Sequence, residues 1–187
     1  MRRVIVFNNT TVDGYFVDMK GDMSWAHNAD PEFLSFVQGN ASSGGGELLF
    51  GRITYEMMAG YWPTPMAVKN DPIVAKGMNE MPKIVFSRTL DTVSWNNTRL
   101  LKGDPAAEVR KLKKAPGGDI VIMGSGSIVS RLAQEGLIDE YQFVIVPVAL
   151  GKGRTQFDGM NEKLPLKLVS SRVFKNGNVF LCYQPKG

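Results

Sequence analysis

Apolar runs of strand length alternate with helix-like patterns along most of the chain. Strands are expected at residues 3–7, 47–50, 83–87, 99–102 and 119–123, where apolar side chains cluster. Helical patterns occupy most of the segments between these runs. Because strands that alternate with helices build parallel pairs through crossover connections, the pattern predicts an α/β fold with a mainly parallel sheet.

Three Asp-Pro pairs predict where helices begin. Asp30-Pro31, Asp71-Pro72 and Asp104-Pro105 each place a capping carboxylate before a proline at the first helical position. The first helix should bury an apolar face and close at the three glycines of residues 44–46; the face consists of Phe33, Leu34, Phe36 and Val37. The second helix should turn inward the side chains of Ile73, Val74 and Met78.

The pattern changes after Glu140. Three long β-rich runs, at residues 141–148, 166–174 and 179–184, follow one another without a helical segment between them. Such runs indicate antiparallel strands that complete one edge of the sheet. Asn176-Gly177, between the last two runs, is a strong hairpin signal because both residues tolerate the positive φ of a tight turn.

Two strand-to-helix junctions contain residues suited to binding phosphate. Gly51-Arg52-Ile53-Thr54 follows the strand at 47–50, and Gly124-Ser125-Gly126-Ser127 follows the strand at 119–123. Glycine lets a ligand approach the backbone, and a helix N-terminus directs unpaired N–H groups and partial positive charge at it. Two such junctions on parallel strands can hold the phosphates of a dinucleotide, although an isolated glycine turn is as often purely structural.

A third strand end strengthens this hypothesis. Ser87-Arg88 follows the strand at 83–87, and ligands of open α/β sheets bind outside the carboxyl ends of parallel strands. Arg52 and Arg88 at neighbouring strand ends suit a 2′-phosphate, whereas a site for NADH would be expected to offer a carboxylate to the free ribose hydroxyl. The residues therefore favour NADPH as the cofactor.

Composition limits the other possibilities. The chain has 187 residues, of which 43% are hydrophobic and 21% are charged. We interpret residues 1–187 as a single globular domain without a membrane span. One cysteine and one histidine argue against a disulfide and a zinc site, and a cytoplasmic location fits best. The net charge of +4 includes a basic cluster at 110–114, but no aromatic side chains are interleaved for stacking bases, so no nucleic-acid partner is expected.

Several segments also resemble known reductases. Gly51-Arg52-Ile53-Thr54-Tyr55-Glu56 resembles the GRxTxE junction of dihydrofolate reductases, and the segment 85–89 resembles the strand end that holds their adenosine 2′-phosphate. Thr11-Val12-Asp13-Gly14, Leu137-Ile138-Asp139-Glu140 and the segment 147–153 resemble motifs of the riboflavin-biosynthesis reductases, the RibD C-terminal domain group. These motifs occur in the family's order from about residue 4 to residue 183.

The resemblance implies a fold, an activity and an assembly. The fold would be a dihydrofolate-reductase-like three-layer α/β/α arrangement around a central mixed, mostly parallel sheet with an antiparallel C-terminal edge. The protein would be an NADPH-dependent reductase of a small heterocyclic substrate, similar to the 5-amino-6-(5-phosphoribosylamino)uracil reductase of riboflavin biosynthesis. A homodimer is expected from the family and from the frequency of two-fold oligomers.

The resemblance also implies roles for individual residues. Gly51, Arg52 and Thr54 would meet the adenosine-side phosphates, Ser87 and Arg88 the 2′-phosphate, and Gly124, Ser125, Gly126, Ser127 and Ile128 the pyrophosphate. Thr11 and Asp13, in one segment, would bind the substrate, with Asp13 near the nicotinamide.

Asp13 and Asp30 are the candidates for catalytic carboxylates, with structural alternatives as a turn residue and a helix cap. Trp25 and Trp62 either wall a flat substrate or anchor their loops on the core.

One departure from the family bears on the substrate. Riboflavin reductases usually carry a glutamate at the end of the strand before the glycine turn, and Met123 stands there instead. A thioether cannot accept hydrogen bonds from a pyrimidine as a carboxylate does. A dihydrofolate reductase, with Asp30 as an imperfect pterin anchor, and a nucleotide-binding module without turnover therefore stay open as alternatives.

Overall fold

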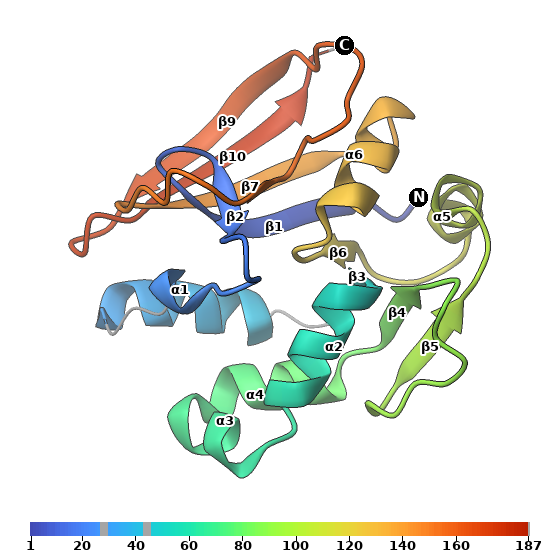
Figure 1. Cartoon of the computed structure of the whole chain (residues 1–187), viewed down its shortest axis with the longest axis horizontal. Helices are drawn as coiled ribbons and strands as arrows, with labels where there is room; N and C mark the ends of the chain where they lie inside the picture. Colours follow the sequence, from blue (N-terminus) through green and yellow to red (C-terminus); the bar gives the residue numbers. More distant parts are fainter. Residues whose placement is uncertain (27–29, 43–45, 187) are drawn as a thin grey trace.

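The computed structural model describes residues 1–26, 30–42 and 46–186, and its centre is an eight-stranded sheet (Figure 1). The strands lie in the order β5-β4-β3-β6-β1-β7-β10-β9. Their bounds are β1 Val4–Thr11, β3 Glu47–Gly51, β4 Lys83–Phe86, β5 Thr98–Leu101, β6 Ile120–Ile122, β7 Glu140–Val146, β9 Leu166–Val173 and β10 Val179–Pro185. From β5 to β7 every neighbouring pair is parallel, whereas β10 is antiparallel to both β7 and β9.

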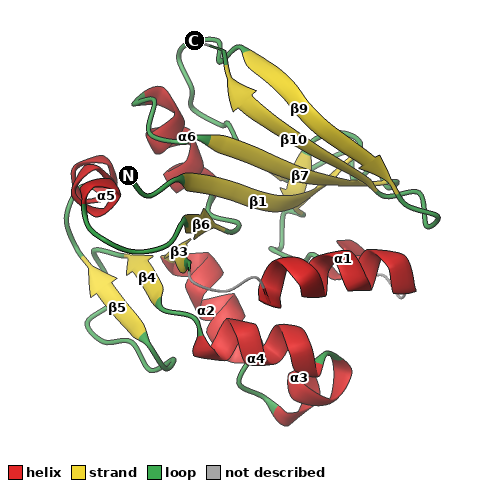
Figure 2. Cartoon of the chain, turned by 180° about the vertical axis from the view of Figure 1, so that it is seen from behind, coloured by secondary structure: helices red, strands yellow, loops and turns green. Residues whose placement is uncertain are grey.

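Helices cover both faces of this sheet and make the expected three layers (Figure 2). The helices are α1 Pro31–Ser42, α2 Arg52–Tyr61, α3 Pro65–Asn70, α4 Pro72–Glu80, α5 Pro105–Lys114 and α6 Gly126–Gln134, with a short 3-10 turn, η1, at Ser24–Ala26. On one face α5 and α6 bury residues such as Val109 and Leu132 against Val4 and Ile120. On the other, α1, α2 and α4 pack against β3, β4, β7 and β10. The α/β class and its mostly parallel sheet are confirmed.

The three predicted helix caps are present. Asp30, Asp71 and Asp104 accept hydrogen bonds from the N–H groups of Phe33, Val74 and Ala107 at 2.8, 3.1 and 2.9 Å. Each carboxylate satisfies an orphan N–H of the first turn, as its position before a proline predicts. Two of the glycines expected to close α1, at positions 44 and 45, lie outside the described residues.

One sequence-based expectation is wrong, and another is incomplete. Ile73 was expected to face inward but is 47% exposed, while Val74 and Met78 are buried as expected. The run that became β7 is antiparallel to β10, as expected, but it also pairs parallel with β1 along its whole length, Ile5 opposite Glu140 through Thr11 opposite Val146. The chain passes from β6 through α6 to β7, and such a crossover returns the strand in the same direction as its neighbours.

The hairpin prediction is confirmed. Gly177, with φ +88°, lies in the turn between β9 and β10 and donates its N–H to the carbonyl of Phe174 at 3.0 Å. The N–H of Phe174 in turn donates to the carbonyl of Asn178 at 2.9 Å.

Three elements had no clear signal in the sequence. The strand β1 continues through the polar residues Asn8 to Thr11 rather than ending at Phe7. The helix α3, capped by Thr64, follows a segment interpreted as a loop. A second sheet pairs β2 (Tyr15–Val17) with β8 (Arg154–Thr155), and these strands are too short and too far apart in sequence to show periodicity.

Candidate functional site

A cavity of about 600 Å³ opens at the carboxyl ends of β3, β4, β6 and β1. All ten residues expected to bind the cofactor line it: Gly51, Arg52, Thr54, Ser87, Arg88, Gly124, Ser125, Gly126, Ser127 and Ile128. These residues follow β4, β3 and β6, which lie side by side in the sheet and run parallel. The carboxyl ends of the three strands therefore meet at one edge of the sheet. The volume suits a small molecule or part of a dinucleotide.

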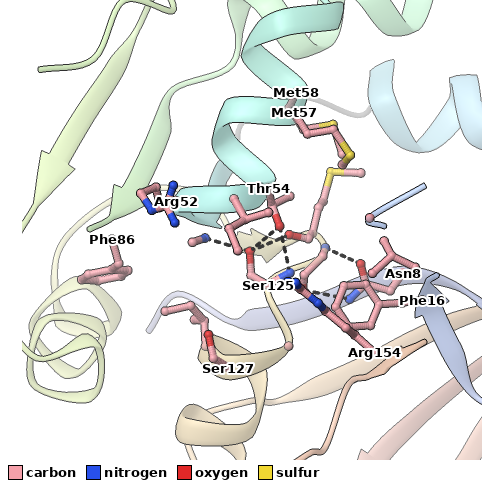
Figure 3. A pocket seen from close by; sticks show the side chains of 18 of the residues that line it. Asn8, Phe16, Arg52, Thr54, Met57, Met58, Phe86, Ser125, Ser127 and Arg154 are labelled. Carbon is pink, nitrogen blue, oxygen red and sulfur yellow. Dashed lines mark hydrogen bonds between the residues drawn. The ribbon is translucent and has the colours of Figure 1, made fainter. Parts of the chain in front are cut away.

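The two glycine-bearing junctions are bonded directly to each other (Figure 3). The hydroxyl of Ser125 accepts a hydrogen bond from the N–H of Gly51 at 2.7 Å, and the N–H of Ser125 donates to Thr54 Oγ1 at 3.1 Å. The Ser125 and Thr54 hydroxyl oxygens are also 3.1 Å apart. Both side chains are buried, so their hydroxyls fix one junction against the other instead of facing a ligand as the sequence suggested.

Close packing explains the glycines of the second junction. Gly124 has φ +57°, and a Cβ there would lie 2.7 Å from Thr54 Oγ1. A Cβ on Gly126 would lie 2.8 Å from the carbonyl oxygen of Thr155, which belongs to the small β2–β8 sheet. Ser125 between them is a non-glycine residue in the left-handed region, with φ +59°, a conformation that surrounding structure must stabilise.

Asn8 was missed by the sequence reasoning although it holds this junction in place. Its side chain donates from Nδ2 to the carbonyl of Gly124 at 3.3 Å and accepts the N–H of Gly124 at Oδ1. A further bond, 2.9 Å long, joins Nδ2 to Oε1 of the buried Gln156. The available signal was an asparagine inside a strand, where this residue type is unfavourable without a specific partner.

Three arginines line the cavity. Arg52 forms an exposed ion pair with Glu56 one turn along α2, with Nη1 and Oε2 2.9 Å apart. Arg88 follows the turn made by Ser87, whose Oγ accepts the N–H groups of Thr89 and Leu90 at 3.2 and 3.0 Å. Arg154, which sequence reasoning did not select, lines the cavity from β8. Within the described residues, neither Arg88 nor Arg154 has an acidic partner, so both are available to an anion.

The residues expected on the substrate side lie outside the cavity lining. Asp13 accepts hydrogen bonds from the Thr11 hydroxyl at 2.6 Å and from the N–H of Gly151 at 2.7 Å, and these bonds hold its pKa below the usual value. Asp30 caps α1. Their expected catalytic role is therefore not supported by position, because both carboxylates are engaged in local structure away from the cavity.

The two tryptophans are also placed as loop anchors. Trp25 packs beside the cluster that contains Phe33 and Phe174. Trp62 donates from Nε1 to the sulfur of Met58 at 3.1 Å and packs on the cluster under α2 and α4. Neither ring lines the cavity. Thr11 does not line it either: its side chain is buried at the end of β1 and donates to Asp13.

One part of the cavity lining is mostly apolar and rich in methionine. Four thioethers line it, those of Met23, Met57, Met58 and Met123. On the same side of the sheet as Met123 lie Phe7 and Asn9 of β1. Figure 3 shows Met57 and Met58 on the side of the cavity formed by α2, away from Ser127. The cavity thus has one rim with backbone N–H groups and arginines, and another wall without charge.

The fold is that of a dihydrofolate-reductase-like α/β protein. A dihydrofolate reductase from Enterococcus faecalis, described as complexed with NADP(H) and RAB-propyl, superposes with a TM-score of 0.65 at 16% identity over 99% of this chain and 97% of that one. A putative riboflavin biosynthesis protein from Shewanella sp. PV-4 gives 0.75 at 23% identity, with 99% of each chain covered.

Sequence comparison defines the family more narrowly. The model of the RibD C-terminal domain matches residues 2–180. YyaP from Bacillus subtilis (strain 168), an uncharacterised protein, is 30% identical over 187 residues, which cover 100% of this chain and 96% of YyaP. The chain belongs to the RibD C-terminal domain family. No helix in the described part of the chain is long and apolar enough to span a membrane.

Proposed function

We propose that the protein is an NADPH-dependent reductase of a small heterocyclic substrate. The observation that carries this proposal is the convergence of three strand ends on one cavity, with Arg52 and Arg88 on neighbouring ends. Two helix N-termini, of α2 and α6, also begin at this rim and are suited to phosphate. Family membership supports a reductase, while the substrate and the cofactor are inferred from the residues.

The rim residues have distinct proposed roles. Arg88, free of an acidic partner among the described residues, would bind the 2′-phosphate as a charge-assisted pair. The N–H groups at the start of α6 and the exposed Ser127 hydroxyl would bind the pyrophosphate. Thr54 and Ser125 would act indirectly, by holding both junctions at the spacing that the phosphates require.

When bound, NADPH supplies a hydride, and the chain's residues orient the reacting partners. The Asn8 side chain fixes Gly124 at the end of β6, beside the point where β1 passes the cavity. The methionines and Phe7 would pack against the apolar face of the acceptor. Since the described residues of this wall include no carboxylate, we propose that water delivers the proton to the substrate.

Dihydrofolate is a less favoured substrate. A pterin-binding carboxylate was expected near the start of α1, but Asp30 bonds the N–H of Phe33 there. The neighbouring Glu32 pairs with Arg172 of β9, with Oε1 and Nη2 2.8 Å apart. Neither carboxylate lines the cavity, and the carboxylate that the described lining does contain, Asp158, follows β8 and not the start of α1, where the pterin anchor was expected.

Titration calorimetry tests the cofactor, and spectrophotometry at 340 nm tests turnover. NADPH should bind at least about tenfold more tightly than NADH, because a phosphate–arginine pair adds more than 1.4 kcal/mol. NADPH oxidation should then depend on an added acceptor. No heat with NADPH would contradict the proposal, and tight binding without oxidation by any acceptor would favour a nucleotide-binding module.

We also propose that residues 1–187 form a single domain that works as a cytoplasmic homodimer. Two-fold oligomers are the commonest assemblies, and the cysteine of the chain, Cys182, is buried and free, as suits a reducing compartment. Light scattering coupled to gel filtration measures the mass directly. A monomer at micromolar concentration would contradict the dimer and leave the cofactor proposal intact.

A further inference from the structure

The uncharged wall of the cavity is built from two neighbouring strands and one helix. In the parallel β1–β6 pair Val6 lies opposite Ile122, so the next residues, Phe7 and Met123, are also neighbours. Phe7 packs beside the Phe33 cluster under α1, and Met123 packs beside the Leu48 and Phe50 cluster. Both side chains therefore point to the α1 and α4 face of the sheet, where Met57 and Met58 of α2 extend the wall.

Charged groups of the described lining lie elsewhere. They are Arg52 at the first residue of α2, Arg88 after β4, Arg154 in β8 and Asp158 shortly after it. The carboxylates closest in sequence to the uncharged wall, Asp13 and Asp30, are engaged with backbone N–H groups outside the lining. A charged substituent bound against this wall would lose its hydration without meeting an oppositely charged group on the wall itself, and that loss is costly.

Asn9 is the polar exception on this wall. It lies two residues after Phe7 in β1, and alternate strand residues share a face, so it points to the same side as Phe7. Its Oδ1 is shielded from solvent and accepts no hydrogen bond from any described residue. Buried polar groups in native proteins are almost always bonded, so an unpartnered carbonyl oxygen in a cavity lining indicates a ligand contact.

From this arrangement we infer that the substrate is an uncharged planar acceptor without a phosphate, and that Asn9 is the residue that orients it. The inference rests on the proposed reductase function and specifies its substrate. Thioethers pack adaptably against flat rings, and a carboxamide offers one donor and one acceptor to a lactam or amidine edge.

The reaction balances with the proposed cofactor alone. The hydride, with its electron pair, passes from NADPH to the carbon of a C=N or C=O bond and leaves NADP⁺. The π bond breaks, a C–H bond forms, and the heteroatom takes a proton from water. No other oxidant or reductant is needed.

Two matched pairs of acceptors test the charge requirement. Dihydrobiopterin and dihydrofolate share a reducible ring, but the second carries a tail with two carboxylates. The ribosylaminouracil nucleoside and its 5′-phosphate differ by the phosphate alone. In each pair the uncharged member should have a kcat/KM at least about tenfold higher than the charged member, or should bind at least about tenfold more tightly to the NADP⁺-loaded protein. A tenfold difference corresponds to about 1.4 kcal/mol.

Variants of Asn9 test the orienting role. Asn9→Leu keeps the volume and removes both hydrogen-bonding groups, so kcat/KM for the preferred uncharged acceptor should fall at least about fivefold while NADPH affinity is unchanged. Asn9→Asp should favour an acceptor with two N–H donors over one with a carbonyl edge. Asn176→Leu, in the β9–β10 turn away from the cavity lining, is the control for the loss of an amide side chain, with its hydrogen bond to the N–H of Asn178, outside the cavity.

The outcomes separate the two proposals. Preference for the charged member of either pair, or absence of binding and turnover with both uncharged members, would overturn this inference while NADPH binding still supports a reductase. Failure of NADPH to bind would instead overturn the proposed function. Equal loss of NADPH affinity and of kcat/KM in Asn9→Leu would show that Asn9 serves the cofactor and not the substrate.

Discussion

The hydroxyl oxygens of Thr54 and Ser125 lie 3.1 Å apart although 71 residues separate them in the sequence. Thr54 belongs to the first turn of α2, and Ser125 is the N-cap of α6. The contact therefore joins two helix N-termini, one after each of the parallel strands β3 and β6. The spacing of the two junctions is set by this buried bond and by the Gly51 N–H bond to the same serine.

Removing this link should loosen the rim. Thr54→Val keeps the shape but leaves the N–H and hydroxyl of Ser125 without that partner, so the free energy of unfolding should fall by about 1–2 kcal/mol. Urea unfolding of Thr54→Val, Ser125→Ala and the double variant gives the coupling. Additive effects, with no interaction energy between the two sites, would contradict the direct link.

Packing at Gly124 can be separated from backbone strain. Gly124→Ala introduces a Cβ 2.7 Å from Thr54 Oγ1 at φ +57°, whereas Gly136→Ala has a similar φ of +62° but no atom within 4 Å. Both variants should lose about 1 kcal/mol from strain, and Gly124→Ala should lose about 1–3 kcal/mol more from overpacking. Equal thermal midpoints for the two variants would show that the contact with Thr54 is readily relieved.

Arg88 should discriminate between the two nicotinamide cofactors. Arg88→Ala should weaken NADPH binding roughly 10- to 150-fold, since a charge-assisted bond contributes about 1.5–3 kcal/mol, and should leave NADH binding unchanged. Arg110→Ala is a suitable control because Arg110 pairs with Glu135 on the α5–α6 face and does not line the cavity. An equal loss for both cofactors would assign Arg88 to another part of the ligand.

Lys83 should make the stability of the protein rise with pH above neutrality. Its side chain is fully buried, donates to the carbonyls of Asn79 and Met81 at 3.1 and 2.6 Å, and lies over the Trp95 ring. Burial lowers its pKa from 10.5 to about 8, so the unfolded chain binds more protons than the native state above that pH.

The free energy of unfolding should consequently increase by about 1 kcal/mol between pH 8 and pH 9, relative to Lys83→Met measured in parallel. The parallel measurement is needed because burial raises the pKa values of Tyr141 and Cys182, and deprotonation of these groups in the unfolded chain acts in the opposite direction at higher pH. A constant difference between the two proteins across this range would contradict the assignment.

Local chemistry made part of the fold and site predictable. The Asp-Pro caps, the Asn176-Gly177 turn and the strand-end residues Arg52 and Arg88 carry their signals within a few neighbouring positions. Glycine, proline and capping residues restrict the backbone through short-range sterics and hydrogen bonds, which the sequence displays directly. Because neighbouring strands of a parallel sheet run in the same direction, their carboxyl ends lie at one edge of the sheet, and this does not depend on the side chains of the intervening segments.

Other features depended on contacts between distant segments. The direction of β7, the pairing of β2 with β8 and the bond of Asn8 to Gly124 join residues that are over a hundred positions apart. The sequence alone showed which hydroxyls and carboxylates were available, namely Thr54, Ser125, Asp13 and Asp30, and it indicated the partner of Asp30 alone, as a helix cap. Tertiary structure decided that all four bond protein atoms while Asn9 and Arg154 line the cavity, because a short-range pattern does not encode which buried polar groups meet.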